Sequence, residues 1–386
     1  MRILYGVVGE GMGHATRSRV VVEHLLARGH EVCIVVSGKA HAFLTKSFAE
    51  SARVTVLEIH GLHLVLDDGE LDKSETLWSN LESAPAGIKK NIEVYRERVA
   101  PFRAELVVSD FESFAYTYAR LHDLPVVSID NMQILNRCEI DDALTEGEES
   151  AFRVAKLAVK SKLPGAYHYL VSTFFFPRVK KPRTTLVPPI LRRAVLDARR
   201  EPGDHVLVYQ TGQVGLTLLP VLKTLPGRYR VYGSGREGEE GNVTLRPFSE
   251  QGFVDDMRTA RAVIANAGFS LASECVHLGV PMLALPVREQ FEQILNARAL
   301  EREGYGRATT TLDGDVLRAF LDEIPRCDAA LARYPRHDNT MLFDCLDELV
   351  RHVSLDEPRV DRVSAPNMGA HDPHPIDPSL DGDDDG

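Results

Sequence analysis

The sequence has few cysteines, and they are not spaced as in a metal site or a disulfide framework. Five cysteines are spread over 386 residues, and no two of them form a C-x-x-C pair. Cys33, Cys138, Cys275, Cys327 and Cys345 are therefore expected to be reduced thiols in a cytoplasmic protein.

Long apolar runs are also missing. No stretch approaches the about 18 consecutive apolar residues that a membrane-spanning helix needs. The chain begins directly with the strand-like MRILYGVV, not with a charged segment followed by a long apolar one. We expect no targeting segment, no membrane span and at most peripheral contact with a membrane.

Positive charge is in deficit, and most of the excess acid lies at one end. Lys and Arg total 45 against 56 Asp and Glu, a net charge of −11. This balance disfavours a nonspecific nucleic-acid binder. Residues 356–386 hold nine of the acids, two arginines and five prolines. We predict that this tail is disordered, serving either as a solubilising terminus or to dock a basic partner.

The remaining composition is that of a folded globular protein, with 44% hydrophobic and 26% charged residues. The length favours two domains. In the first half, strand-length apolar runs alternate with helix-period stretches at about 16–28, 75–99 and 113–122, which is typical of β-α units around a parallel sheet. The strands are expected at residues 3–8, 32–36, 54–59, 106–109, 126–129 and 167–174. We assign residues 1–175 to a first doubly wound domain.

A basic run with five prolines over residues 176–204 breaks both periodicities and predicts a linker. A second alternating set then predicts another α/β domain over 205–355. Its strands are expected at 206–209, 230–232, 263–265 and 282–285, and its helices at 215–223, 269–278 and 290–302. A last helix over 340–353 has no assigned packing partner and could return to the first domain.

A glycine-rich loop, GEGMGH, follows the first strand and opens a helix. Gly11 and Gly13 allow close backbone approach, and a helix start favours an anionic or electron-rich group such as a phosphate or a sugar. A dinucleotide fingerprint fails, because His14 stands where its third glycine belongs and no carboxylate follows the second strand. The alternative is that the glycines only tighten a turn.

A base for catalysis is suggested by His14 together with Asp110, which ends the strand in ELVVSD. Both should project from the same edge of one sheet. A carboxylate on one imidazole nitrogen fixes the tautomer and leaves the other nitrogen free to take a hydroxyl proton. Taken singly, each residue could be structural, Asp110 as a cap of the following helix.

The second domain carries the stronger signal, in NAGFSLASE after a strand and at a helix start. Such a helix N-terminus suits a phosphate. Glu274 lies close enough to accept hydrogen bonds from sugar or ribose hydroxyls. The next helix opens with Glu292 and Gln293, and the two helix starts are expected to face one cleft.

The run NAGFSLASECVHLGVPMLALPVREQFEQILNA resembles the donor-binding signature of GT-B glycosyltransferases that use nucleoside-diphosphate sugars. Plant-type UDP-glycosyltransferases and the lipid-linked N-acetylglucosaminyltransferase of peptidoglycan synthesis are members. The GEGMGH loop with Arg17 is also similar to a microbial glycosyltransferase group and to a nucleotide-sugar hydrolase. The resemblance implies a GT-B fold, in which two Rossmann-like doubly wound domains enclose a cleft.

The resemblance also implies roles for individual residues. Gly268, Phe269 and Ser270 would hold the donor diphosphate, Glu274 its ribose, and Glu292 with Gln293 the donor sugar. The other positions that it assigns to the donor are Thr211 and Gly212 at the phosphates, Phe248 beside the base, and Asn266.

His14 and Asp110 match the family's base and its orienting acid. Asn266 stands where retaining members carry a first glutamate, so inversion is favoured. The sequence thus predicts an inverting hexosyltransferase that moves a sugar from a nucleotide donor, UDP-linked by expectation, to a hydroxyl acceptor, without a metal. A nucleotide-sugar hydrolase or epimerase and a catalytically silent binding protein remain as alternatives.

Overall fold

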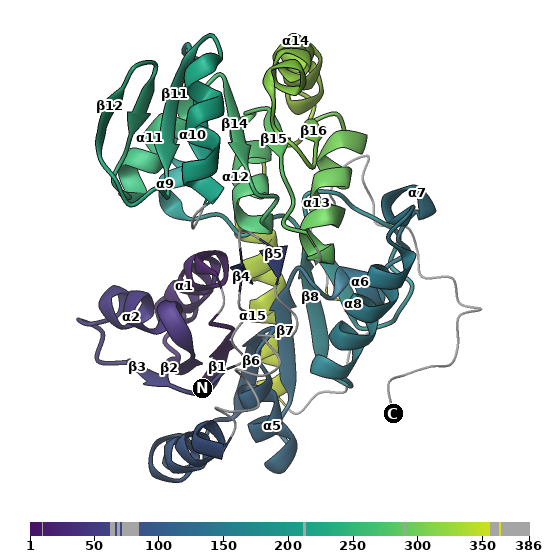
Figure 1. Cartoon of the computed structure of the whole chain (residues 1–386). Coiled ribbons are helices and arrows are strands. Elements are labelled where there is room, and N and C mark those ends of the chain that lie inside the picture. Colours follow the sequence, from purple (N-terminus) through teal and green to yellow (C-terminus); the bar gives the residue numbers. More distant parts are fainter. Residues whose placement is uncertain are drawn as a thin grey trace.

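Two α/β units, each built on one parallel sheet, make up the computed structural model of the chain (Figure 1). The structure describes residues 1–9, 11–61, 66–67, 70–71, 85–210, 214–288, 290–355 and 363. Apart from Val363, the predicted acidic tail lies outside these residues, and so do Thr211 and Gly212.

The first sheet has seven parallel strands in the order β3-β2-β1-β6-β7-β8-β9. The strands are β1 (Arg2–Val7), β2 (Glu31–Val36), β3 (Val54–Glu58), β6 (Leu106–Asp110), β7 (Val126–Asp130), β8 (His168–Ser172) and β9 (Thr184–Val187). The helices include α1 (Met12–Ala27), α2 (Gly38–Ser47), α5 (Ser113–Leu121), α6 (Ile134–Arg137), α7 (Asp142–Thr145) and α8 (Glu149–Lys162). The inner strands are buried on both faces, which explains their nearly continuous apolar sequence.

The second sheet has seven strands in the order β12-β13-β11-β10-β14-β15-β16, with only β12 antiparallel to its neighbour. The strands are β10 (His205–Tyr209), β11 (Arg228–Tyr232), β12 (Gly238–Glu240), β13 (Val243–Leu245), β14 (Ala262–Ala265), β15 (Met282–Ala284) and β16 (Gly306–Ala308). The helices are α10 (Val214–Thr224), α11 (Glu250–Thr259), α12 (Phe269–Leu278), α13 (Phe291–Arg302) and α14 (Gly314–Leu331). The predicted strands and helices of both units are present, with ends shifted by a few residues.

Two segments differ from the prediction. The predicted helix over 75–99 is described from residue 85, and it continues through a π-helical turn, η1 (Tyr95–Val99), into α4 (Ala100–Phe102). The predicted linker over 176–204 contains β9, which pairs with β8, so the first sheet extends to Val187. Prolines on both sides of this four-residue strand hide its periodicity.

Arginines of the basic run anchor it to the two units. Arg183 donates to the carbonyl oxygen of Ala166 at 2.9 Å. Arg200 donates to the carbonyl oxygens of Gly279 at 3.2 Å and Arg258 at 3.0 Å. The run also contains the short helix α9 (Arg193–Leu196). These side chains satisfy backbone carbonyls, so the run is a fixed connection between the units.

The last helix, α15 (Thr340–Ser354), returns to the first unit, where it lies beside the first sheet (Figure 1). Its buried stripe packs with residues of β1, α1 and β8, and consists of Met341, Leu342, Cys345, Leu346, Leu349 and Val350. The chain therefore crosses between the units twice.

All five cysteines are buried free thiols. Within the described ranges, no helix combines the length and the apolar character that crossing a membrane requires.

The buried stripe of α15 predicts that this helix stabilises the first unit. Leu346→Ala should lower the free energy of unfolding by about 2–5 kcal/mol, because it leaves a cavity in the core. The matched control is Leu355→Ala, whose side chain lies just beyond α15 and is 59% exposed. Urea unfolding measures both variants, and equal stability losses would contradict the packing role.

Candidate functional site

The first sheet reverses its strand order between β1 and β6, and His14 and Asp110 meet at this point. Asp110 is the last residue of β6, and His14 lies in the first turn of α1, directly after β1. Nδ1 of His14 is 2.8 Å from Oδ1 of Asp110. Ligands of open parallel sheets bind at such reversals, beyond the carboxyl ends of the strands.

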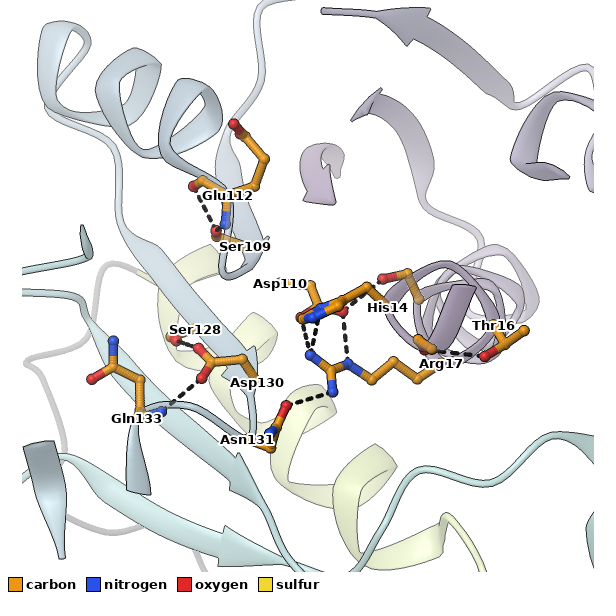
Figure 2. Close-up of polar contacts among 12 residues, drawn as sticks. His14, Thr16, Arg17, Ser109, Asp110, Glu112, Ser128, Asp130, Asn131 and Gln133 are labelled. Atoms are coloured by element: carbon orange, nitrogen blue, oxygen red, sulfur yellow. Dashed lines mark hydrogen bonds and ion pairs between the residues drawn. The ribbon is translucent and has the colours of Figure 1, made fainter. Parts of the chain in front are cut away.

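A third side chain, Arg17, joins this pair from the next turn of α1 (Figure 2). Its Nε donates to Oδ2 of Asp110 at 2.8 Å, and Nη2 donates to Oδ1 at 2.5 Å. Both residues are buried. Burial alone would raise the pKa of Asp110, but Arg17 and His14 outweigh it and hold that pKa well below its usual range. Asp110 is therefore ionised throughout the physiological range.

His14 has two competing neighbours at Nδ1. Nη2 of Arg17 lies 2.6 Å from this nitrogen, and Oδ1 of Asp110 lies 2.8 Å from it. Arginine only donates and an ionised carboxylate only accepts, so Nδ1 satisfies one of them at a time. When Nδ1 carries the proton and donates it to Asp110, Nε2 has a free lone pair. The His14 side chain is 17% exposed, so an acceptor can reach it.

Asn131, directly after β7, connects this cluster to the second unit. Its Oδ1 accepts from Nη1 of Arg17 at 2.7 Å, and its Nδ2 donates to Oε1 of Glu292 at 2.6 Å. Glu292 belongs to the first turn of α13. The predicted base and the predicted donor-sugar acid are thus joined through two side chains.

The second sheet reverses its strand order between β10 and β14, and α12 begins at this point. Gly268 is the N-cap of α12, and Gly11, with φ 85°, is the N-cap of α1. Neither first turn contains an acidic residue, and neither cap has a side-chain hydrogen bond. A Cβ added to Gly268 would meet nothing within 4 Å, so space for a ligand lies in front of it.

The N-termini of α1 and α12 lie against each other. A Cβ on Gly13 would lie only 2.5 Å from Oγ of Ser270, so glycine permits this approach. The positive ends of both helix dipoles therefore point at one region, which favours an anion there.

The other predicted donor residues are distributed around α12 and α13. Phe269 is buried and stacks on Phe174 of the first unit, with centroids 6.0 Å apart. Gln293 accepts from the backbone N–H of Val287 at 3.0 Å, and so orders the loop before α13. Phe248 is 66% exposed in the loop before α11.

Asn266 is partly buried after β14. Glu274 is buried, and each of its carboxylate oxygens accepts one hydrogen bond from Arg192, at 2.7 and 2.8 Å. Sequence reasoning did not find Arg192, Asn131 or Asp130. A polar residue directly after a buried strand was the available signal for Asn131, whereas Arg192 lies in the basic run and has no local pattern.

Asp130, beside Asp110 at the end of β7, is a buried carboxyl group of another kind (Figure 2). It accepts from the Ser128 hydroxyl at 2.7 Å and from the backbone N–H of Gln133 at 2.8 Å. Burial raises its pKa from 3.8 to about 6. Compared with the unfolded chain, the folded chain therefore favours the neutral form of Asp130. The stability of the folded protein falls as the pH rises from about 4 to about 6.

Asp130→Asn should relieve this penalty, because the amide has a similar shape and no charge. We expect the variant to melt at a higher temperature than the wild type at pH 8, with a smaller gap at pH 5, where the penalty is only partly developed. Thermal unfolding at both pH values measures the gap. A gap of constant size would show that Asp130 is not protonated in the folded protein near pH 5.

Two seven-stranded sheets covered by helices, with the site between their order reversals, define the GT-B fold. The model of the family described as "Glycosyl transferase family 1" matches residues 1–325, and the chain belongs to this family. An "Uncharacterized glycosyltransferase" of Methanosarcina acetivorans is 28% identical over 332 residues, which cover 80% of this chain and 85% of that protein.

Solved structures share the fold at low identity. The glycosyltransferase SnogD from Streptomyces nogalater is 18% identical, with a TM-score of 0.51, over 90% of this chain and 99% of that one. LpCGTa, solved in complex with UDP, is 16% identical, with a TM-score of 0.61, over 92% of this chain and 99% of that one.

Proposed function

We propose that this glycosyltransferase inverts the anomeric centre as it moves a hexose from a nucleoside-diphosphate sugar, UDP-linked, to a hydroxyl acceptor. The observation that carries the proposal is that two groups lie at the two sheet reversals, on helices whose N-termini are in contact. The His14–Asp110 pair lies at one sheet reversal, and the open N-terminus of α12 lies at the other.

His14 acts as the general base in this proposal. With Nδ1–H donated to Asp110, Nε2 takes the proton of the acceptor hydroxyl as its oxygen attacks the anomeric carbon. The new bond joins acceptor oxygen to that carbon, and the bond from the carbon to the diphosphate oxygen breaks. In the resulting imidazolium, Nδ1–H still donates its hydrogen bond to the ionised carboxylate of Asp110.

The leaving diphosphate would be received at Gly268, where the first-turn N–H groups of α12 and the helix dipole stabilise its added charge. Thr211 and Gly212 would complete this site, and Glu292, held by Asn131, would bind a hydroxyl of the donor sugar. These groups supply the stabilisation without a metal ion, so we propose that none takes part.

The proposed donor also accords with the bound state of a structural relative, since LpCGTa was solved with UDP. We propose the cytoplasm as the site of action, in line with five free buried thiols. The acceptor class follows from the general base, which a hydroxyl nucleophile requires.

The proposed base can be tested with His14→Ala. We expect transfer turnover to fall by roughly 10²- to 10⁴-fold, because the acceptor loses its proton acceptor, while affinity for UDP stays unchanged. A donor-consumption assay and calorimetric titration measure the two quantities. The control is His122→Ala, which changes an exposed histidine at the C-terminal end of α5, the end farther along the chain from Asp110.

Full turnover in His14→Ala would remove the residue from the mechanism. Release of free sugar by the wild type at the same rate with and without acceptors would instead identify a nucleotide-sugar hydrolase.

The stereochemistry of the product tests the single displacement. The acceptor enters from the side of His14 and the diphosphate leaves toward Gly268, so an α-linked UDP-glucose donor should give a β-linked product. The anomeric proton coupling constant of the isolated product distinguishes the two linkages. An α-linked product would contradict both the single displacement and the base role of His14.

A further inference from the structure

A second buried ion pair, Arg192 with Glu274, lies apart from the His14 cluster. Nε of Arg192 donates to Oε1 of Glu274 at 2.7 Å, and Nη2 donates to Oε2 at 2.8 Å. The two side chains are only 8% and 10% exposed. Arg192 is the N-cap of α9, whereas Glu274 belongs to α12, so the pair fixes the connection between the units against the donor-binding helix.

Two more charges extend the pair into an alternating cluster. Nη1 of Arg192 lies 3.4 Å from Oε1 of Glu250, the first residue of α11. Nη2 of Arg19, on α1, donates to that same Oε1 at 2.9 Å. These four side chains alternate in charge, and Glu23 adds a third anion, 3.7 Å from Nε of Arg19. Burial raises the pKa of the neighbouring Cys275 thiol, which therefore stays neutral.

Arg192 opposes the effect of burial on Glu274. Burial raises the pKa of this carboxyl group and the charge of Glu250 raises it further, so the pKa stays above its ordinary value although Arg192 lowers it. Removing the guanidinium would therefore raise the pKa of Glu274 still further.

The pair leaves Glu274 able to bind a ligand. A bidentate arginine uses one lone pair on each carboxylate oxygen, and each oxygen keeps a second one. The Glu274 side chain keeps 10% of its surface exposed, and Glu274 follows Gly268 by about one and a half turns of α12. A ribose next to a diphosphate bound at Gly268 would therefore lie on the same helix as this carboxylate.

We propose that Arg192 is a positioning residue, which holds Glu274 in a fixed orientation as the acceptor for the ribose hydroxyls of the donor nucleotide. The proposal rests on the nucleotide-sugar function described above. Arg192 acts through Glu274, and all three of its guanidinium nitrogens already face carboxylates.

Matched nucleotides isolate the ribose contact. UDP and 2′-deoxy-UDP differ by one hydroxyl group, so the ratio of their affinities reports the Glu274 contact and cancels the diphosphate and the base. We expect the wild type to prefer UDP by about tenfold or more at pH 8, because a hydrogen bond to an ionised group is lost in the deoxy compound. Calorimetric titration measures both affinities.

In Arg192→Gln, the preference should fall below about threefold at pH 6 and recover in part at pH 8. The reason is that Glu274 becomes protonated at the lower pH and ionises again as the pH rises. Arg192→Lys keeps a positive charge but loses the two-point contact, so its preference should be reduced about threefold and be the same at both pH values. The control Arg193→Gln changes an exposed neighbour that pairs with Asp197, and should behave as the wild type.

The outcomes separate the two proposals. A wild type that binds neither nucleotide contradicts the UDP-linked donor. A wild type that binds both equally overturns the role of Glu274 and Arg192 while leaving the donor site standing. If Arg192→Gln does not fold, Arg192→Lys decides, and a wild-type preference in that variant overturns the positioning role. A folded Arg192→Gln with a wild-type preference at both pH values does the same.

Discussion

The buried ion pair between Arg17 and Asp110 is the interaction on which the site depends. Removing either partner would leave an uncompensated buried charge, at a cost of about 3–5 kcal/mol. The guanidinium also binds Asn131, so one side chain fixes the start of α1, the end of β6 and the residue after β7. His14 takes its position on the same carboxylate, and Glu292 is reached through Asn131. Asp110 therefore orients the proposed base, while Arg17 neutralises much of the negative charge of Asp110.

The geometry of the site follows from the order of the strands. Each sheet begins with its central strand, β1 or β10, and extends to one side before reversing to the other. The helix that follows the central strand must then meet the first strand on the other side, β6 or β14, at one edge of the sheet. Two such edges face each other, and Gly13 lets α1 approach Ser270 at the start of α12. The fold thus brings the proposed base and the proposed diphosphate site together.

Local sequence pattern was enough for the parts whose signal is short-range. Buried parallel strands read as apolar runs, and the positions of His14 and Asp110 followed from where two of those runs end. The sequence pattern did not predict β9, because prolines flank its four residues. The partners of the site residues could not be predicted for a different reason. Arg192 and Glu274 are 82 positions apart in the sequence, and Asn131 and Glu292 are 161 positions apart. Such pairings are decided by how the units pack, which no local periodicity records.

The contacts between the two units differ in strength along the interface. On one side, aromatic rings pack across it, Phe174 on Phe269 and Phe152 on Phe291, where burial contributes in proportion to the apolar area removed from water. Between α1 and α11, Arg19 pairs with Glu250 while the two side chains are 20% and 34% exposed, and pairs of this kind contribute about 0–1 kcal/mol. The units are therefore held together chiefly through the aromatic contacts.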